Sequence, residues 1–454
     1  MGKRKKKSQA DRISHLAEAI DDARLAALNP DPGPAAPTDL PVLLGRLLPL
    51  RDELPQLYQE AFFDPYVAFL QTLSRVEFSQ ILLNANAAQF VLDIAQCILQ
   101  NGEGFEQQAN EAFQEVVSDL FNGFLSAGSR LGVKPPDQSM IPPMVKFGNP
   151  DSGPYTFTIG ATAQLGLQTG LVSLPPANAR GGMLAWTALG HETAGHDILH
   201  ADTGLLGELR DTVRTEVNDA DVGDFLPEYW AQRIDETGSD ALGVLHIGPA
   251  AGIGLIGYFR GLNAAFSGVV GLRNRGGSGP HPADILRGFL GAECVRHLAF
   301  DGSDEWADLI LAETEKDVTT IVLEGNEIDS ELAKKSAEAV ARVVVSTPMV
   351  SLENHALCEI MNWTNDDEAV VDQIKPFLTT NQTIPDSLAS GLKAAHAVSA
   401  ATMSALSGEA PIDAIFQRML LVLQTMHAKN PVNSPLMIAE GDLVQHRVFE
   451  PEHA

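Results

Sequence analysis

The sequence predicts a mainly helical protein with a small β-sheet, an α+β fold. Three observations predict this class. Apolar residues recur every three or four positions over long stretches, as in FDPYVAFLQTLSRVEFSQILL, and this spacing places them on one face of a helix. A central stretch, Tyr155 to Pro176, is instead rich in Thr, Val and Gly with partial alternation, which is typical of short strands. Hydrophobic residues make up 44% and charged residues 20% of the chain, which indicates a globular protein with a large core.

Changes in composition along the chain divide it into five expected parts. These are a disordered basic and proline-rich tail (1–37), a helical N-terminal region (38–150), a mixed core (151–300), a helical C-terminal region (301–430) and an extended tail (431–454). The stretch NPDPGPAAPTDLP is too rich in proline for a helix. GVKPPDQSMIPPMVKFGNPDSGP, rich in proline and glycine, marks the boundary before the mixed core.

The mixed core reads as two strands followed by three helices. The two strands lie within 155–176 and are joined by a glycine-containing turn, and GLVSLPP is the expected edge strand because its prolines stop further growth of the sheet. A helix is expected from Gly182, and a second one has Pro227 in its first turn. A glycine-rich loop, GLRNRGGSGPHP, then leads into a helix after Pro282.

Charge and cysteine content exclude several classes of protein. The formal net charge of -28 argues against nucleic-acid binding, which needs clustered Lys and Arg. The three cysteines, far apart and odd in number, predict no disulfide framework and favour a reducing, cytoplasmic location: Cys97, Cys294 and Cys358. The most apolar segment, 241–272, is interrupted by polar residues and a proline, so it is expected to be buried core rather than an integral membrane span. The oligomeric state stays open.

Three histidines and a glutamate lie within eleven residues, GHETAGHDILH, which begin at Gly190. His191 and His196 are five positions apart, and five residues of regular α-helix turn by about 500°, so the two side chains would diverge by roughly 140°. They can bind one metal ion only if an extra residue bulges out, as in a π-bulge. Gly195 sits beside His196, and its conformational freedom would permit the distortion. His200, four residues after His196, offers a rival ligand pair.

The third ligand is expected from DETGSD. Glu236 and Asp240 are four residues apart and share a face of a helix. Glu236 can then reach the metal while Asp240 accepts a hydrogen bond from a ligand histidine and fixes its orientation. Glu192 remains free to act as general base toward a water on the metal.

These motifs resemble those of known zinc peptidases. HETAGH resembles the H-E-x-x-G-H motif of the dipeptidyl peptidase III family, and ETGSD resembles the E-x-x-x-D of the wider gluzincin group. PHPADILRG resembles the H-P-x-x-x-x-R element of CAAX prenyl protease-like metallopeptidases. The resemblance covers about 140 residues, from Tyr155 to about Leu298, while the helical flanks resemble no family.

The resemblance implies a zincin-like catalytic core and a zinc-dependent hydrolase of peptide bonds acting on a peptide or protein. It implies zinc ligands at His191, His196 and Glu236, a base at Glu192, and Asp240 behind a ligand histidine. It also suggests that His281 or Arg287 contacts the substrate or the developing oxyanion.

Two alternatives to a zinc hydrolase remain. The same two histidines and one carboxylate are typical of non-haem iron enzymes, so iron could replace zinc. The chain could also be a non-enzymatic helical binding or assembly protein with a degenerate metallopeptidase core, since its flanks are large and its surface acidic.

Overall fold

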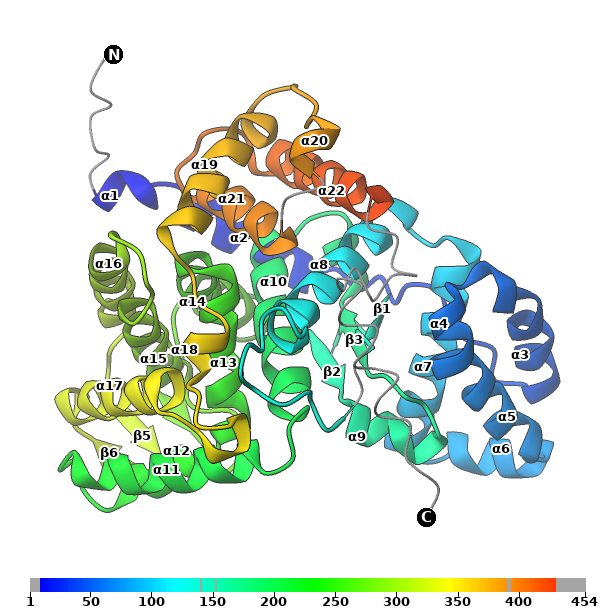
Figure 1. The fold of residues 1–454 in the computed structure, drawn as a ribbon, viewed down its shortest axis with the longest axis horizontal. Coiled ribbons are helices and arrows are strands. Elements are labelled where there is room, and N and C mark those ends of the chain that lie inside the picture. Colours follow the sequence, from blue (N-terminus) through cyan, green and yellow to red (C-terminus); the bar gives the residue numbers. More distant parts are fainter. Residues whose placement is uncertain (1–8, 139–140, 152, 390–392, 430–454) are drawn as a thin grey trace.

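Helices dominate the architecture of this chain, and two three-stranded sheets accompany them (Figure 1). The computed structural model describes residues 9–138, 141–151, 153–389 and 393–429. The predicted class, mainly α with a small β component, is confirmed. The extended tail predicted at 431–454 lies outside the described residues.

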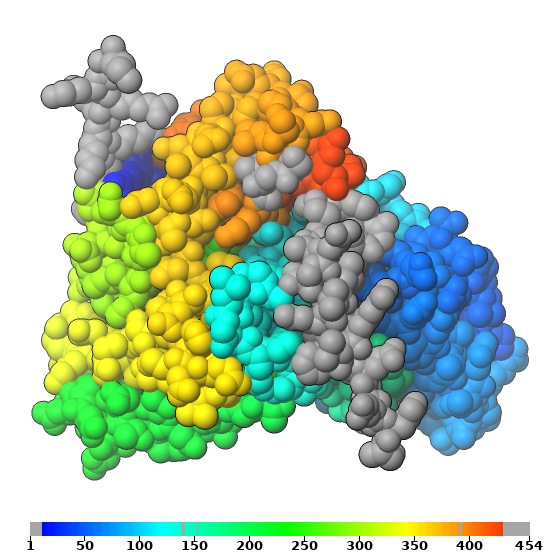
Figure 2. Space-filling view, viewed as in Figure 1, coloured from blue at the N-terminus to red at the C-terminus, as the bar shows by residue number. Residues whose placement is uncertain are grey.

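The N-terminal helices form a core of their own at one end of the molecule, coloured blue in Figure 2. Its central side chains, Leu43, Tyr66 and Ile94, are fully buried. Asn84 caps the longest of these helices by accepting a hydrogen bond from the Ala87 amide. The elements are α3 (Leu40–Leu47), η1 (Leu48–Glu53), α4 (Gln56–Tyr58), η2 (Gln59–Phe63), α5 (Asp64–Thr72), α6 (Arg75–Leu82) and α7 (Ala85–Glu103).

A mixed sheet separates this core from the main one. Its strand order is β1 (Met144–Phe147), β3 (Leu171–Leu174), β2 (Tyr155–Phe157); β3 runs parallel to β1 and antiparallel to β2. Leu171 faces the N-terminal core and Val172 the main core, so β3 is apolar on both faces.

Three expectations about this sheet are wrong. The GLVSLPP segment forms the central strand β3, and β2 is an edge. The two predicted strands are separated by α9 (Ile159–Thr162) and η3 (Ala163–Leu165) rather than by a turn. The strand β1 precedes the predicted boundary at residue 150 yet belongs to the same sheet, because its Val145 and Phe147 pack into the main core.

The main core joins helices from all parts of the chain. The helix α8 (Gln107–Leu125), N-terminal to the sheet, packs against α22 (Ile412–Lys429) near the C-terminus. A second sheet, with the order β4 (Arg275–Gly276), β5 (Ile321–Leu323), β6 (Asn326–Ile328), borders this core. Its remaining helices are α10 (Met183–Thr187), α11 (Leu205–Asp219), α12 (Phe225–Ala231), α13 (Ile234–Ile247), α14 (Pro249–Ser267), α15 (Asp284–Arg296), α16 (Ser303–Glu315), α17 (Ser330–Ser346), α18 (Leu357–Ile360), α19 (Asn365–Thr379), α20 (Asp386–Ala389) and α21 (Ala394–Leu406).

Part of the predicted disordered tail is folded. Residues Leu16–Ala27 form α2, which follows the short α1 (Gln9–Arg12), and the Leu16, Ile20 and Ala23 side chains are buried. They pack on α14, where a Cβ built on Gly261 would lie only 2.8 Å from the Ala23 Cβ. The prediction of disorder across 1–37 is therefore wrong for α2, because apolar residues at helical spacing give it a face to bury.

The apolar segment 241–272 is buried core, as predicted, over 241–261 on α13 and α14. The prediction is wrong for 266–270, where Phe266, Val269 and Val270 are exposed. His246 is also core: its Nδ1 donates to the Leu242 carbonyl at 2.8 Å, and burial lowers its pKa to about 4. Among the described residues no single helix is long and apolar enough to cross a membrane; α6 and α7, bent by 113° at their junction, pass that test only together.

Candidate metal centre

The segment that carries the two spaced histidines is a π-helix. It covers Gly190–Asp197 as η5 and follows α10. Wider winding than in an α-helix brings a residue back toward the one five positions before it, so the His191 and His196 rings lie 4.9 Å apart between centroids, at 86° to each other. The prediction that an extra residue bulges out is confirmed.

Gly195 serves a different purpose from the one expected. Its φ is not positive, so it has no need of glycine's backbone freedom. Instead, η5 presses against α13, and a Cβ on Gly195 would lie 2.3 Å from the Ser239 Cβ, far inside van der Waals contact. Glycine is required here because the two backbones approach closely.

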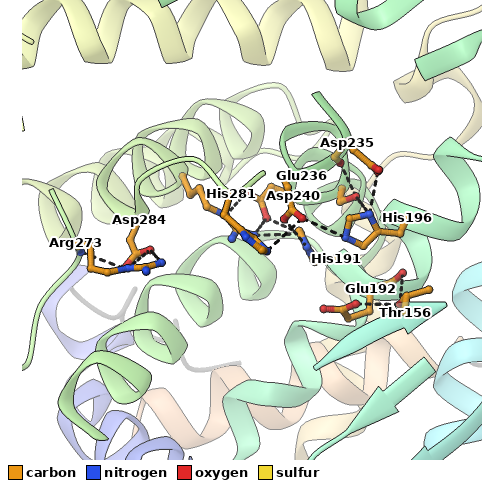
Figure 3. A network of polar contacts seen from close by, with 12 residues as sticks. Thr156, His191, Glu192, His196, Asp235, Glu236, Asp240, Arg273, His281 and Asp284 are labelled. Carbon is orange, nitrogen blue, oxygen red and sulfur yellow. Dashed lines mark hydrogen bonds and ion pairs between the residues drawn. The ribbon is translucent and has the colours of Figure 1, made fainter. Parts of the chain in front are cut away.

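This close approach brings three ligand-type side chains together (Figure 3). One donor atom each from His191, His196 and Glu236 lies within 4.8 Å of the other two. The Nε2 of His191 is 3.3 Å from Glu236 Oε2, and the Nε2 of His196 is 3.8 Å from Oε1. The group can hold a metal ion, and it is the set of ligands that the sequence predicted.

Carboxylates behind the histidines fix how both rings point. The Nδ1 of His191 donates to Asp240 Oδ1 at 2.8 Å, as predicted. The Nδ1 of His196 donates to Asp235 Oδ1 at 2.9 Å, and His200 Nε2 donates to the other oxygen at 2.9 Å. Each ring therefore turns its Nε2 toward Glu236.

Asp235 was missed from the sequence, and His200 is not part of the ligand group. Asp235 directly precedes Glu236 and does not share the helix face of Glu236 and Asp240; its carboxylate reaches His196 and His200 instead. The pairing of His200 with Asp235 instead of a metal partner overturns the rival pair of His196 and His200. The one sign of Asp235 in the sequence was His200, four residues after the ligand His196, because a second histidine on that face can share its carboxylate partner.

Arg287, which was expected to contact a substrate, lies behind Asp240 in the interior. Its side chain is buried, and its Nε and Nη2 each donate to an Asp240 oxygen at 2.7 Å. The guanidinium also lies over the Phe259 ring at 4.5 Å. Asp240 therefore needs Arg287 to remain charged in the interior, and Arg287 acts on the centre through Asp240.

His281, by contrast, lies at the open side of the centre. Its side chain is 58% exposed, and its Nε2 lies 3.3 Å from Glu236 Oε1. The chain is held on both sides of His281: Arg233 donates to the Gly277 carbonyl at 2.7 Å, and the Ala283 amide donates to the Tyr229 hydroxyl at 3.1 Å. His281 is thus placed to touch a ligand of the centre or a molecule bound there.

The charged groups of the centre shift one another's pKa values. Burial by itself lowers the pKa of His191, but its hydrogen bonds to Asp240 and Glu236 outweigh burial and raise that pKa to about 10. Burial favours the neutral form of Glu236, but the hydrogen bond with His191 lowers its pKa to about 2. A cation bound between the two residues would favour the neutral form of His191, because an imidazole that binds a metal carries no proton on the ligating nitrogen.

Glu192 is buried next to the ligands and is hydrogen-bonded to the edge strand β2 (Figure 3). The Thr156 hydroxyl of β2 lies 2.9 Å from Glu192 Oε2 and 3.1 Å from the Glu192 carbonyl oxygen. Thr156 could not be identified from the sequence, because nothing in a three-residue strand shows which side chain of another element it faces.

Comparison of this chain with protein-family models, with curated proteins and with solved structures finds no match.

Proposed function

We propose that this protein is a zinc-dependent hydrolase of peptide bonds with a gluzincin-like, zincin-like core and a peptide or protein as substrate. The observation that carries the proposal is the meeting of His191, His196 and Glu236 beside Glu192. Two imidazoles and one carboxylate, with a further position open, are a common donor set for catalytic zinc.

The closest pair of donor atoms has the separation expected for such an ion. Two ligands of a tetrahedral zinc with bonds of about 2.0–2.1 Å lie about 3.3 Å apart, and the His191 to Glu236 separation is 3.3 Å. Glu236 Oε2 is buried and accepts no well-formed hydrogen bond from the described residues, so a cation would satisfy it. When bound, zinc supplies Lewis-acid polarisation of a carbonyl and lowers the pKa of water.

The chain's own residues would perform the proton transfers and hold the substrate. Glu192 accepts the proton of the attacking water and then delivers it to the leaving amine. The exposed imidazole of His281 donates a hydrogen bond to the substrate carbonyl oxygen, where negative charge develops. The edge strand β2 offers main-chain groups with which an extended peptide can pair.

The test combines elemental analysis with hydrolysis of casein and of a fluorogenic peptide library. Protein purified without chelator should hold about one zinc per chain. Glu192→Gln should retain the zinc but lose roughly 10²–10⁴-fold in kcat. His191→Ala and Glu236→Ala should lose both the zinc and the hydrolysis. His200 lies near the centre without a ligand role, so His200→Gln should keep both.

Three results would count against the proposal. Full activity in Glu192→Gln would show that Glu192 is not the general base. Bound iron without peptide hydrolysis would favour an oxidative enzyme on the same donors. A chain that holds no metal would favour a binding or assembly protein.

A further inference from the structure

The hydroxyl of Thr156 holds one of the two carboxylate oxygens of Glu192. It lies 2.9 Å from Oε2, within hydrogen-bond distance. A hydroxyl carries one proton, and a bond to a charged carboxylate is stronger than one to the Glu192 carbonyl at 3.1 Å. The other carboxylate oxygen, Oε1, accepts no hydrogen bond within the part of the chain that the structure describes.

The strand that carries Thr156 is anchored on both sides of this residue. Thr156 pairs with Val172 of β3. The Tyr155 hydroxyl donates to Asp93 Oδ2 at 2.6 Å, and the phenyl ring of Phe157 packs against that of Phe90 with centroids 5.1 Å apart.

The anchor at Asp93 is itself a buried ion pair. The Lys146 ammonium, from β1, lies 2.8 Å from Asp93 Oδ1, and its side chain is fully buried. It also lies 3.0 Å from Gln96 on α7. A buried pair of this kind holds one geometry, because separating its charges would leave each of them unpaired in the interior. The position of Thr156 is therefore held firmly, although β2 is an edge strand.

We propose that Thr156 is a positioning residue for Glu192: its hydroxyl fixes Oε2, so that Oε1 faces the water to be deprotonated. The inference rests on the proposed function for its catalytic meaning. The coupling between Thr156 and Glu192 stands apart from it and can be measured without any activity.

The first experiment measures this coupling by thermal unfolding of four full-length proteins: the wild type, Thr156→Val, Glu192→Ala and the double variant. The Tm loss caused by Thr156→Val should be at least twice as large with Glu192 present as with alanine there, because the hydroxyl then loses a charged partner. Equal losses would show that the hydroxyl bonds only the backbone carbonyl, and would overturn the proposal.

The second experiment measures steady-state hydrolysis of a peptide substrate and zinc content. Thr156→Val should lower kcat about tenfold, with KM within twofold and zinc unchanged. Thr156→Ser, which keeps the hydroxyl, should recover at least half of kcat. Thr158→Val, two residues along and without a side-chain cap bond, is the matched control and should behave as the wild type.

The outcomes separate the two proposals. A wild type that hydrolyses peptides while Thr156→Val keeps its kcat overturns the positioning role alone. Equal losses in Thr156→Val and Thr156→Ser also overturn it, because the hydroxyl would then not matter. A wild type without hydrolysis overturns the proposed function, and the unfolding experiment still decides whether Thr156 holds Glu192.

Discussion

Gly195 lies directly against Ser239, so closely that a Cβ on the glycine would sit 2.3 Å from the serine Cβ. Five residues earlier on η5, a Cβ on Gly190 would lie 3.0 Å from the Gly243 Cα. Gly190 and Gly195 on η5 and Gly243 on α13 thus let the two helices touch backbone to backbone. The contact brings Glu236 and Asp240 within reach of His191, and it explains why the centre needs small residues between its ligands.

Gly195→Ala should therefore damage both the fold and the centre. The added methyl forces η5 away from α13, and overpacking of a tightly packed site typically costs about 1–3 kcal/mol. The free energy of unfolding in denaturant and the bound zinc should both fall. The control is Gly207→Ala on α11, where a Cβ meets nothing within 4 Å; it should stabilise the protein by up to about 1 kcal/mol. Wild-type zinc binding by Gly195→Ala would contradict the close-contact argument.

Asp235→Asn should weaken metal binding without abolishing it. The carboxylate orients His196 from behind, and loss of such a partner typically lowers metal affinity about 10–100-fold. Competition with a chromogenic chelator measures the change. His200→Gln removes the other neighbour of Asp235 and should change the affinity far less. An equal loss in His200→Gln would mean that His200 takes part in binding the ion.

Arg287→Met should unfold more easily because Asp240 would keep its charge in the interior with only His191 beside it. Removing one partner of a buried ion pair costs about 3–5 kcal/mol. Arg273→Met is the comparison, since the Arg273 side chain is 60% exposed and Asp284 retains a hydrogen bond from Asn263. A stable Arg287→Met variant with weakened substrate binding would restore the role in substrate contact that the sequence suggested.

His246 should make the fold sensitive to mild acid. Burial lowers its pKa from 6.5 to about 4, so the folded chain keeps it neutral while the unfolded chain takes up a proton below pH 6.5. Its contribution is complete above pH 6.5 and is lost as the pH falls toward 4, up to about 3 kcal/mol. Unfolding in urea from pH 7.5 to 4.5 should show a shallower decline for His246→Gln than for the wild type. Parallel curves would exclude a role of His246.

The elements of the centre could be predicted because they depend on spacing within one segment. Five positions between His191 and His196 require an extra residue in the turn, and four between Glu236 and Asp240 give a shared helix face. Local periodicity likewise predicted the helical class. The same reasoning failed for α2, whose apolar face is short and follows a strongly basic stretch, and for β3, whose prolines suggested an edge.

Side-chain partners from distant segments could not be predicted in this way. Three such contacts depend on how separate elements pack. Arg287 pairs with Asp240, Asp235 bonds both His196 and His200, and Thr156 bonds Glu192. The sequence by itself determined which residues can bind a cation and that their helix must be wound more widely. Only the tertiary structure decided which groups hold them, because a helix or strand specifies the direction of its own side chains but not which neighbour fills the space they face.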